Sequence, residues 1–148
     1  MHLHGWKENN MTRFEIDHTV VINDISDFPL LVRLTNDNAE HLFDELSYTN
    51  SSMFDSNNKF LNPNRKKIAV TTEKSATECY VDIETWDDFN REILLWVKVP
   101  LIKSYENTIL CIYYDSTHDD NIEYISDSGS KLSNKVWNTY RIAGGIKL

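Results

Sequence analysis

An acidic segment at residues 115–127 carries the side chains whose chemistry is simplest to interpret. Asp115, Asp119, Asp120 and Asn121 supply four side-chain oxygen donors within one short stretch. Calcium takes about six to eight oxygen ligands in proteins, so these residues are candidate ligands for a structural calcium ion. The spacing lacks the Asp-x-Asp-x-Asp-Gly pattern and terminal glutamate of an EF-hand. A solvated acidic loop without metal is therefore the competing interpretation, and no other cofactor is predicted.

Paired carboxylates are the residues that a glycosidase would need, and Asp82 and Glu84 share one face of a predicted strand. Their side chains would lie about 6–7 Å apart at this spacing. Acidic pairs are also common on solvent-facing strands, and the sequence has no Gly-x-Ser-x-Gly nucleophile elbow. We therefore predict no catalytic residues and a protein that is not an enzyme.

Aromatic side chains offer a second kind of site, a platform on which a sugar ring could stack. Trp86, Trp96 and Tyr113 are the candidate carbohydrate-binding residues. Trp86 falls on the polar face of its predicted strand, so we expect it to be exposed. The alternatives are that these rings fill the core or form a contact between subunits, where aromatic residues are also enriched.

The two cysteines, Cys79 and Cys111, each fall within an apolar run. No Cys-x-x-Cys pair and no zinc-ligand spacing occurs in the sequence. Two free buried thiols are the favoured interpretation, and a disulfide between neighbouring strands is the alternative.

The elements that must position these residues are mostly strands. Two-residue alternation of apolar side chains predicts strands near residues 14–20, 28–35, 68–72, 79–86, 91–99 and 108–114. Pro100 is expected to end the fifth of them. Apolar residues at helical spacing predict one short helix near residues 37–48, with Asp37 and Glu40 as its capping box. Several short strands, one helix and long loops predict a mainly β protein, an antiparallel β-sandwich of the jelly-roll kind.

Domain organisation is expected to be simple. The chain has 148 residues, which suits one domain. We predict a flexible N-terminal arm over residues 1–10, a single sandwich domain over 11–140 and a C-terminal tail over 141–148.

Composition excludes several classes of protein. The formal net charge of −8 argues against nonspecific nucleic-acid binding, which needs a basic surface. No apolar run reaches the roughly 18 residues of a membrane span, so no membrane insertion is expected. The first residues do not form a secretory signal, so synthesis in the cytoplasm without a signal peptide is predicted.

The second half of the chain resembles a known family. The resemblance rests on Glu84-x-Trp86-Asp87, on Leu95-Trp96-Val97-Lys98-Val99-Pro100 and on Thr108 with Tyr114, and the match extends from about Trp6 to Trp137. The family is a β-sandwich domain of unknown function. Its members often directly precede laminin-G or concanavalin-like lectin domains in prokaryotic surface proteins and phage virion proteins. It has no agreed catalytic residues, so the resemblance assigns none.

Two departures from the family shape the functional expectation. Residues 48–66 are longer and richer in Asn than the family pattern, and no lectin-like segment follows Trp137. We therefore expect a non-enzymatic structural subunit of a virus (phage) particle or extracellular surface assembly, acting through protein–protein contacts as a capsid, neck or tail-fibre decoration. Its partners would be other assembly proteins and copies of itself. The alternative is a carbohydrate-binding module on a cell or virion surface.

Overall fold

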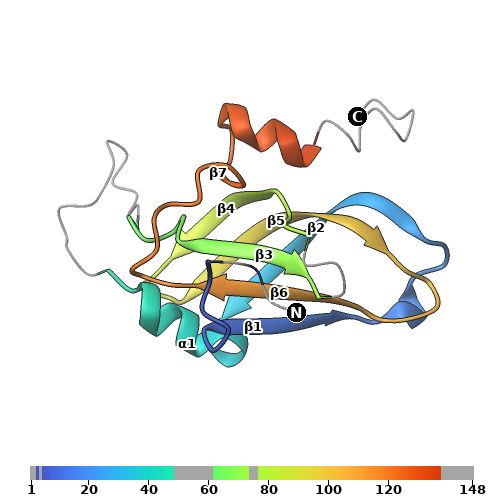
Figure 1. Ribbon diagram of the computed structural model, residues 1–148, viewed down its shortest axis with the longest axis horizontal. Helices are drawn as coiled ribbons and strands as arrows, with labels where there is room; N and C mark the ends of the chain where they lie inside the picture. The colour runs from blue at the N-terminus through green and yellow to red at the C-terminus, as the bar shows by residue number, and fades with distance from the viewer. Residues whose placement is uncertain (1–2, 4, 49–61, 74–76, 138–148) are drawn as a thin grey trace.

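Two β-sheets packed face to face form the body of the protein (Figure 1). The computed structural model describes residues 3, 5–48, 62–73 and 77–137. One sheet has the order β1-β6-β3, formed by Met11–Ile16, Thr108–Tyr114 and Ile68–Thr72. The other has the order β2-β5-β4-β7, formed by Ile25–Thr35, Glu92–Ile102, Val81–Asp87 and Ile125–Asp127. All pairings are antiparallel except that of β4 with β7, so the predicted mainly β sandwich is confirmed.

The strand order has the nested pairing of a jelly roll. β1 pairs with β6 in one sheet and β2 pairs with β5 in the other. β3 and β4, which follow each other in the chain, sit beside these two pairs in opposite sheets. An isolated bridge between Thr71 and Glu78 joins the end of β3 to the segment that leads into β4.

The core lies between the sheets and follows the alternation of the sequence. Leu34, Ile93, Leu95, Val97 and Ile112 have no exposed surface, and each faces the opposite sheet. Removing such side chains from water is the main driving force for closing the two sheets. Charged residues such as Arg13 and Arg33 occupy the outward positions of the same strands.

One helix, α1 (Asn36–Leu46), closes one end of the sandwich, as the sequence predicts for residues 37–48. Its buried face carries Leu42, Phe43 and Leu46. The predicted cap is wrong by two residues, because the side chain of Asn38 accepts a hydrogen bond from the backbone N–H of Thr35 at 2.8 Å. Thr35 is the last residue of β2, so the strand leads directly into the helix.

Three of the differences from the predicted strands have a local reason. β1 ends at Ile16, because the Asp17 carboxylate accepts from the Thr19 N–H at 2.9 Å and starts a 3₁₀ turn. β5 continues through Pro100 to Ile102, because the pairing with β2 skips Pro100 opposite Asp27, whose φ is +53°. β7 was not predicted, because its three residues lie in a polar segment too short to show alternation.

The predicted N-terminal arm contains a packed part. Trp6 is buried and its ring stacks on His118 with the ring centroids 3.8 Å apart. It belongs to a second apolar cluster with Ala69, Cys111 and Tyr113 on the outer face of the three-stranded sheet. Residues 5–10 therefore lie against the folded domain, and the predicted tail at 141–148 lies outside the described residues.

Candidate functional site

The outer face of the four-stranded sheet holds a cluster of two tryptophans and two acids. Asp82 on β4 is directly opposite Trp96 on β5. Trp137 packs edge-on against Trp96, with the ring centroids 5.0 Å apart. The Trp137 indole donates to Oδ2 of Asp82 at 2.9 Å, and the Trp96 indole donates to Oε1 of Glu84 at 3.0 Å. Trp137 thus attaches the segment after β7 to the sheet.

Asp82 is the most perturbed polar group of this cluster. Only 2% of its surface is exposed, and its Oδ1 atom has no hydrogen-bond partner among the described residues. Burial raises the pKa of its carboxyl, although hydrogen bonds from Trp137 and Ser128 oppose this rise. Glu84 and Asp127, both acidic, add to the rise of the Asp82 pKa.

The two carboxylates do not form the open pair that acid–base catalysis needs. Asp82 is covered by Trp137, and Glu84 is exposed and accepts from Trp96. General acid–base catalysis requires both groups to reach one substrate in a cleft. The geometry at Asp82 and Glu84 instead serves to hold the outer layer of the fold together.

The predicted sugar-stacking residues are separated by the fold, and the predicted exposure of Trp86 is wrong. The pairing of β4 with β5 shifts register between Ile83 and Thr85, so Glu84 is an extra residue on β4. One extra residue reverses which side chains face the core. Trp86 therefore lies opposite Ile93 on the core side, with 6% of its surface exposed.

Of the other two candidates, Tyr113 is also buried, at 1% exposure. Its hydroxyl accepts from the backbone N–H of Leu3. Trp96 is half-buried and lies directly across from Leu31, which is exposed. Trp96 alone remains available as a surface aromatic from the predicted set.

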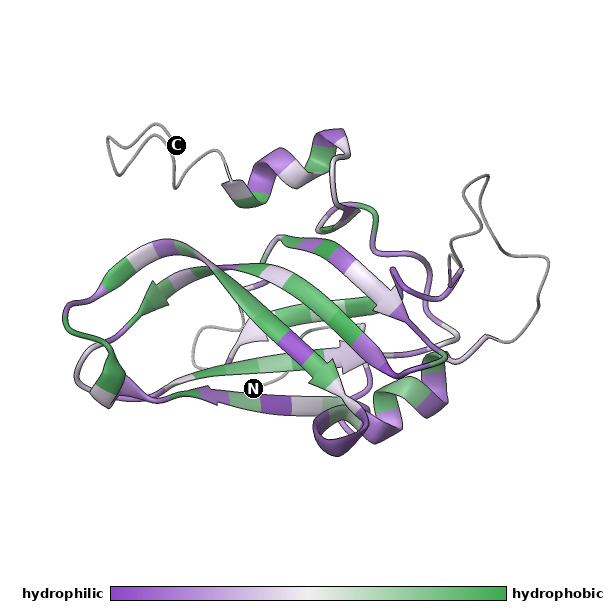
Figure 2. Cartoon of the chain, turned by 180° about the vertical axis from the view of Figure 1, so that it is seen from behind, coloured by the Kyte–Doolittle hydropathy of each residue, from purple (hydrophilic) through white to green (hydrophobic). Residues whose placement is uncertain are grey.

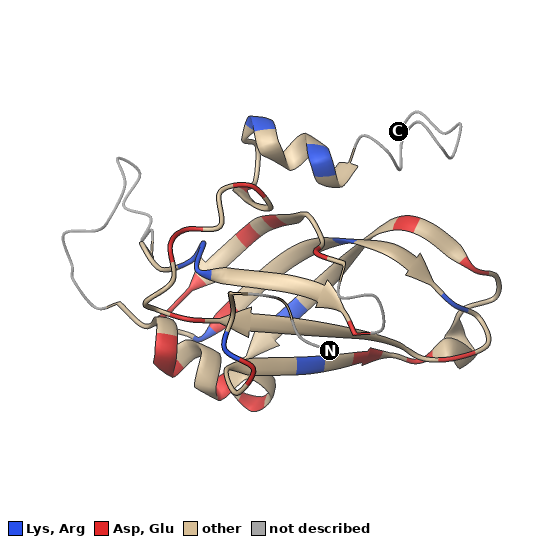
Figure 3. Ribbon diagram, viewed as in Figure 1, with Lys and Arg blue, Asp and Glu red and all other residues tan. Residues whose placement is uncertain are grey.

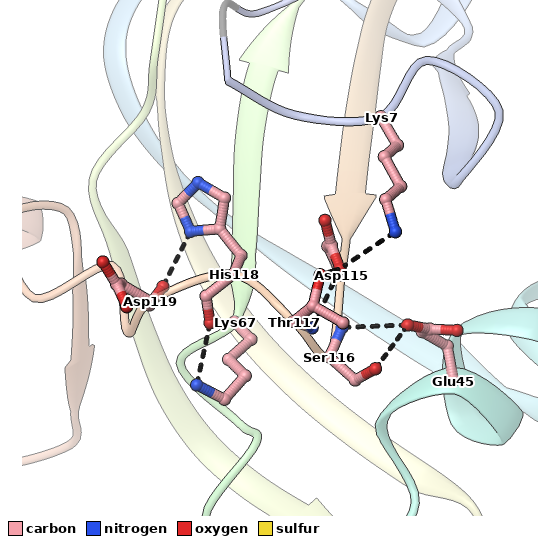
Figure 4. Close-up of polar contacts among 8 residues, drawn as sticks. All are labelled: Lys7, Glu45, Lys67, Asp115, Ser116, Thr117, His118 and Asp119. Atoms are coloured by element: carbon pink, nitrogen blue, oxygen red, sulfur yellow. Dashed lines mark hydrogen bonds and ion pairs between the residues drawn. The ribbon is translucent and has the colours of Figure 1, made fainter.

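The predicted calcium ligands have different partners, and Figure 4 shows two of the four, Asp115 and Asp119. Asp115 is buried and accepts from Thr117, and Lys7 lies 3.5 Å from its Oδ1 atom. Asp120 pairs with Lys67 at 3.1 Å, and Asn121 donates to the carbonyl of Ile68 and to Glu78. Asp119 offers its backbone oxygen to the ring of His118. No group of three potential metal-ligating side chains gathers anywhere in the described part of the chain.

Both cysteines are free and buried, as the favoured interpretation predicts. Burial raises the pKa of the Cys79 thiol to about 12, and burial also raises the pKa of the Cys111 thiol. A thiol must ionise to act as a nucleophile, so burial disfavours the reactive thiolate form of both cysteines.

Exposed apolar side chains on two hydrogen-bonded loops were not predicted as a site. Seven large apolar side chains are exposed among the described residues: Val20, Ile22, Leu31, Phe89, Leu101, Tyr105 and Ile122. Val20 and Ile22 belong to the loop between β1 and β2, and Tyr105 belongs to the loop between β5 and β6. We call these three residues the apolar tip. Their exposed fractions are 76%, 92% and 65% respectively. The two loops lie at the end of the sandwich opposite α1 (Figure 1).

Polar contacts on both sides of the tip residues fix the two loops to each other. The backbone N–H of His18 donates to Oδ1 of Asn107 at 2.9 Å. Ser104 donates through both its N–H and its hydroxyl to Oδ1 of Asp24, at 2.8 and 2.9 Å. Val20 and Ile22 fall between His18 and Asp24 in the chain, and Tyr105 falls between Ser104 and Asn107. The apolar tip is therefore presented on braced loops.

A cavity of about 300 Å³ lies next to the tip, between the ends of the two sheets. Its lining is mainly apolar and includes Pro100, Leu101 and Ile109, with Lys103 and Glu106 from the tip loop. Lys103 pairs with Glu106 at 2.8 Å, and its ammonium lies 5.5 Å from the ring centroid of Tyr105. The hydropathy colouring shows hydrophobic and hydrophilic residues following one another along the strands (Figure 2).

The sequence carried a weak signal for the tip. Alternation placed Val20 on the core face of a long first strand, and Ile22 followed in a stretch with no assigned role. A signal was present in Asp17-x-Thr19, which is an Asx-turn pattern that ends a strand. A turn at Asp17 predicts that the strand ends there and that Val20 and Ile22 lie in a loop.

The fold and these surfaces define a β-sandwich that presents an apolar tip. Comparison with protein-family models, with curated proteins and with solved structures finds no match to this chain. The family resemblance given above therefore stays a prediction. None of the described helices has the length and apolar composition needed to cross a membrane.

Proposed function

We propose that this chain is a non-enzymatic structural subunit of a virus (phage) particle or surface assembly and acts through protein–protein contacts. The observation that carries the proposal is the apolar tip, because Val20, Ile22 and Tyr105 are large, exposed and held on braced loops. Exposed apolar groups that gather in one place mark interaction sites more often than single scattered ones do. A capsid, neck or tail-fibre decoration would use such a tip as its anchor.

The braced loops matter for affinity as well as for position. Ordering a loop during binding costs free energy, which a loop already fixed by hydrogen bonds does not lose again. Burial of apolar surface contributes about 25 cal/mol per Å² removed from water. Aromatic and aliphatic anchors near the centre of an interface supply most of its binding energy. Tyr105 with Ile22 has the composition of such an anchor.

The charges around the tip indicate the kind of partner. Glu15, Asp17 and Asp24 lie on the strand and loop that carry Val20 and Ile22, and Lys103 is already paired with Glu106. Acidic positions are visible on both loops at this end of the molecule (Figure 3). A partner surface with an apolar pocket bordered by Lys or Arg side chains would complement the tip.

Copy number in the native assembly tests the proposal. Particles or surface layers purified from the source organism should contain this chain at a fixed ratio to their main structural protein, measured by quantitative mass spectrometry. A chain that is absent from such assemblies, and that is recovered only as a free protein, would contradict the proposal.

Trp96 supports a second candidate function, that of a carbohydrate-binding module. Its ring is half-buried, and Glu84, the acceptor of its indole N–H, is exposed beside it. A sugar could stack on the open part of the ring and donate a hydroxyl to the free oxygen of Glu84. Binding on a glycan array that is lost in Trp96→Ala and kept in Ile22→Asp would favour this function over the first.

A further inference from the structure

β1 is the least protected of the four sheet edges. β2 carries Pro29 and Asp27, whose φ is positive. Both interrupt the row of backbone groups with which another strand could pair. β3 is covered along its outer edge by residues 77–79, since the N–H of Cys79 donates to the carbonyl of Val70 at 2.7 Å. β7 has only three residues. β1 has six residues with no proline and no left-handed residue.

The register of β1 shows which of its backbone groups point outward. The N–H of Tyr114 donates to the carbonyl of Asn10, so even-numbered residues of β1 exchange hydrogen bonds with β6. The N–H and C=O groups of Arg13 and Glu15 therefore point away from β6. They make no backbone hydrogen bond to another described residue. An open ladder of this kind is a template for another strand.

We propose that a second copy of this chain pairs with β1 through its own β1, antiparallel and about a two-fold axis at Phe14. In this register Arg13 lies opposite Glu15 of the other copy, and Glu15 lies opposite its Arg13. Phe14 meets its own equivalent, and Thr12 meets Ile16. The outward backbone groups of Arg13 and Glu15 then face the same groups of the second copy, which the antiparallel ladder requires.

Charge complementarity selects this register and this occupant. Shifting the axis to Arg13 or to Glu15 would place two like charges directly opposite each other, which is unfavourable in a sheet. Arg13 uses its Nε and Nη2 atoms to bind Oε2 of Glu73, which leaves Nη1 for a second carboxylate. Glu15 accepts from Asn107 through Oε2, which leaves Oε1. Both side chains are exposed, on the outer face of the sheet.

The inner face of the pairing is apolar. Phe14 and Ile16 are only partly buried in one copy, because they lie at the edge of the core. Pairing two β1 strands brings these side chains of both copies together and covers them. The two three-stranded sheets become one continuous sheet across the axis.

The dimer also has a consequence for the proposed function. Only this consequence, and not the dimer itself, rests on the proposed function. β1 leads directly into the loop that carries Val20 and Ile22. An antiparallel pair of β1 strands sends the two tips in opposite directions. A dimer would therefore contact two partner molecules at once, as a decoration or cross-linking subunit requires.

Charge reversal provides the test, by sedimentation velocity of the full chain over a dilution series. The wild type is expected to form a dimer. Arg13→Glu and Glu15→Arg each replace two attractive contacts with two repulsive ones and should raise the dimer dissociation constant about tenfold or more. An equimolar mixture of the two variants pairs Glu with Arg at every position and should restore a dimer that contains one copy of each.

Arg33→Glu is the matched control, because Arg33 also forms an exposed cross-strand pair, with Glu92 at 2.7 Å, but on the other sheet. It should leave the dimer unchanged. Thermal unfolding of each variant separates loss of pairing from loss of folding. A monomeric wild type at every concentration, a dimer unaffected by both reversals, or a mixture that stays monomeric would each overturn the proposal. Variants of the apolar tip leave this dimer intact, so failure of the tip and failure of the β1 pairing are distinguishable.

Discussion

Trp137 donates its indole N–H to Oδ2 of Asp82 at 2.9 Å, while Oδ1 of the same carboxylate has no partner among the described residues. One buried acid therefore both attaches the segment after β7 to the sheet and carries a burial cost that its hydrogen bonds only partly offset. This relationship makes the contribution of Asp82 to the stability of the fold depend on pH.

Replacing Asp82 with Asn tests that dependence. Burial raises the folded-state pKa of Asp82 above its unfolded value. The favourable contribution of the protonated form is therefore complete below the unfolded pKa and is lost as pH rises through the folded pKa. Asp82→Asn should gain stability relative to wild type at pH 7, and the gain should shrink as pH falls towards about 4. Urea unfolding at both pH values measures it, and a difference that does not change with pH would contradict the account.

Asp127 should respond to pH in the opposite direction. Its pKa is lowered, first by the hydrogen bond from Arg65, whose two donors lie 2.8 and 2.7 Å from the two carboxylate oxygens. The stabilisation is present above the unfolded pKa and is lost as pH falls through the folded pKa. Because this pair is partly exposed, Asp127→Asn should cost about 1 kcal/mol of unfolding free energy at pH 7. The cost should disappear in acid, and an equal cost at every pH would count against the pairing.

The β4 bulge predicts unequal roles for two tryptophans. Trp86 faces the core, so Trp86→Ala should lower the free energy of unfolding by about 3–5 kcal/mol. Trp96 is half-buried on the outer face, so Trp96→Ala should cost about 1–2 kcal/mol. Acrylamide should quench the fluorescence of Trp96 more strongly than that of Trp86, measured in variants in which the other three of the four tryptophans are replaced by Phe. Equal costs and equal quenching would contradict the register shift between Ile83 and Thr85.

Variants of the apolar tip should leave the fold unchanged. Ile22 and Val20 bury little apolar surface in the folded state, since most of each side chain is exposed. Ile22→Asp and Val20→Ser should therefore change the free energy of unfolding by less than about 0.5 kcal/mol. Denaturant unfolding measures this change. A larger loss would mean that these residues support the core.

Much of the fold could be predicted from residue alternation, because burial of one strand face imposes a period of two. Ile93, Leu95 and Val97 illustrate this, since they occupy alternate positions of the strand predicted at residues 91–99 and all three are fully buried. The pattern failed where one residue breaks the period. At Glu84 the bulge turns Trp86 inward, and nothing in the alternation of β4 itself shows where the extra residue lies.

The candidate sites were harder to predict, because they depend on contacts between distant residues. Asp115 and Asp120 are close in sequence, but Asp115 pairs with Lys7 and Asp120 pairs with Lys67. The apolar tip depends on the contact of Ser104 with Asp24, which joins two loops that are 80 residues apart. Local spacing does not show which distant residues meet, although the Asx-turn pattern at Asp17 indicates that the first strand ends there.

The central claim is that the apolar tip docks this chain onto its assembly, and a competition in the native host tests it most directly. Wild type and a tagged variant are expressed together, and their ratio in the purified assembly is compared with their ratio in the cell. Ile22→Asp is predicted to be strongly depleted from the assembly. Ile122→Asp, which changes an equally apolar residue exposed outside the tip, is predicted to enter like wild type. Equal incorporation of Ile22→Asp and wild type would contradict the account.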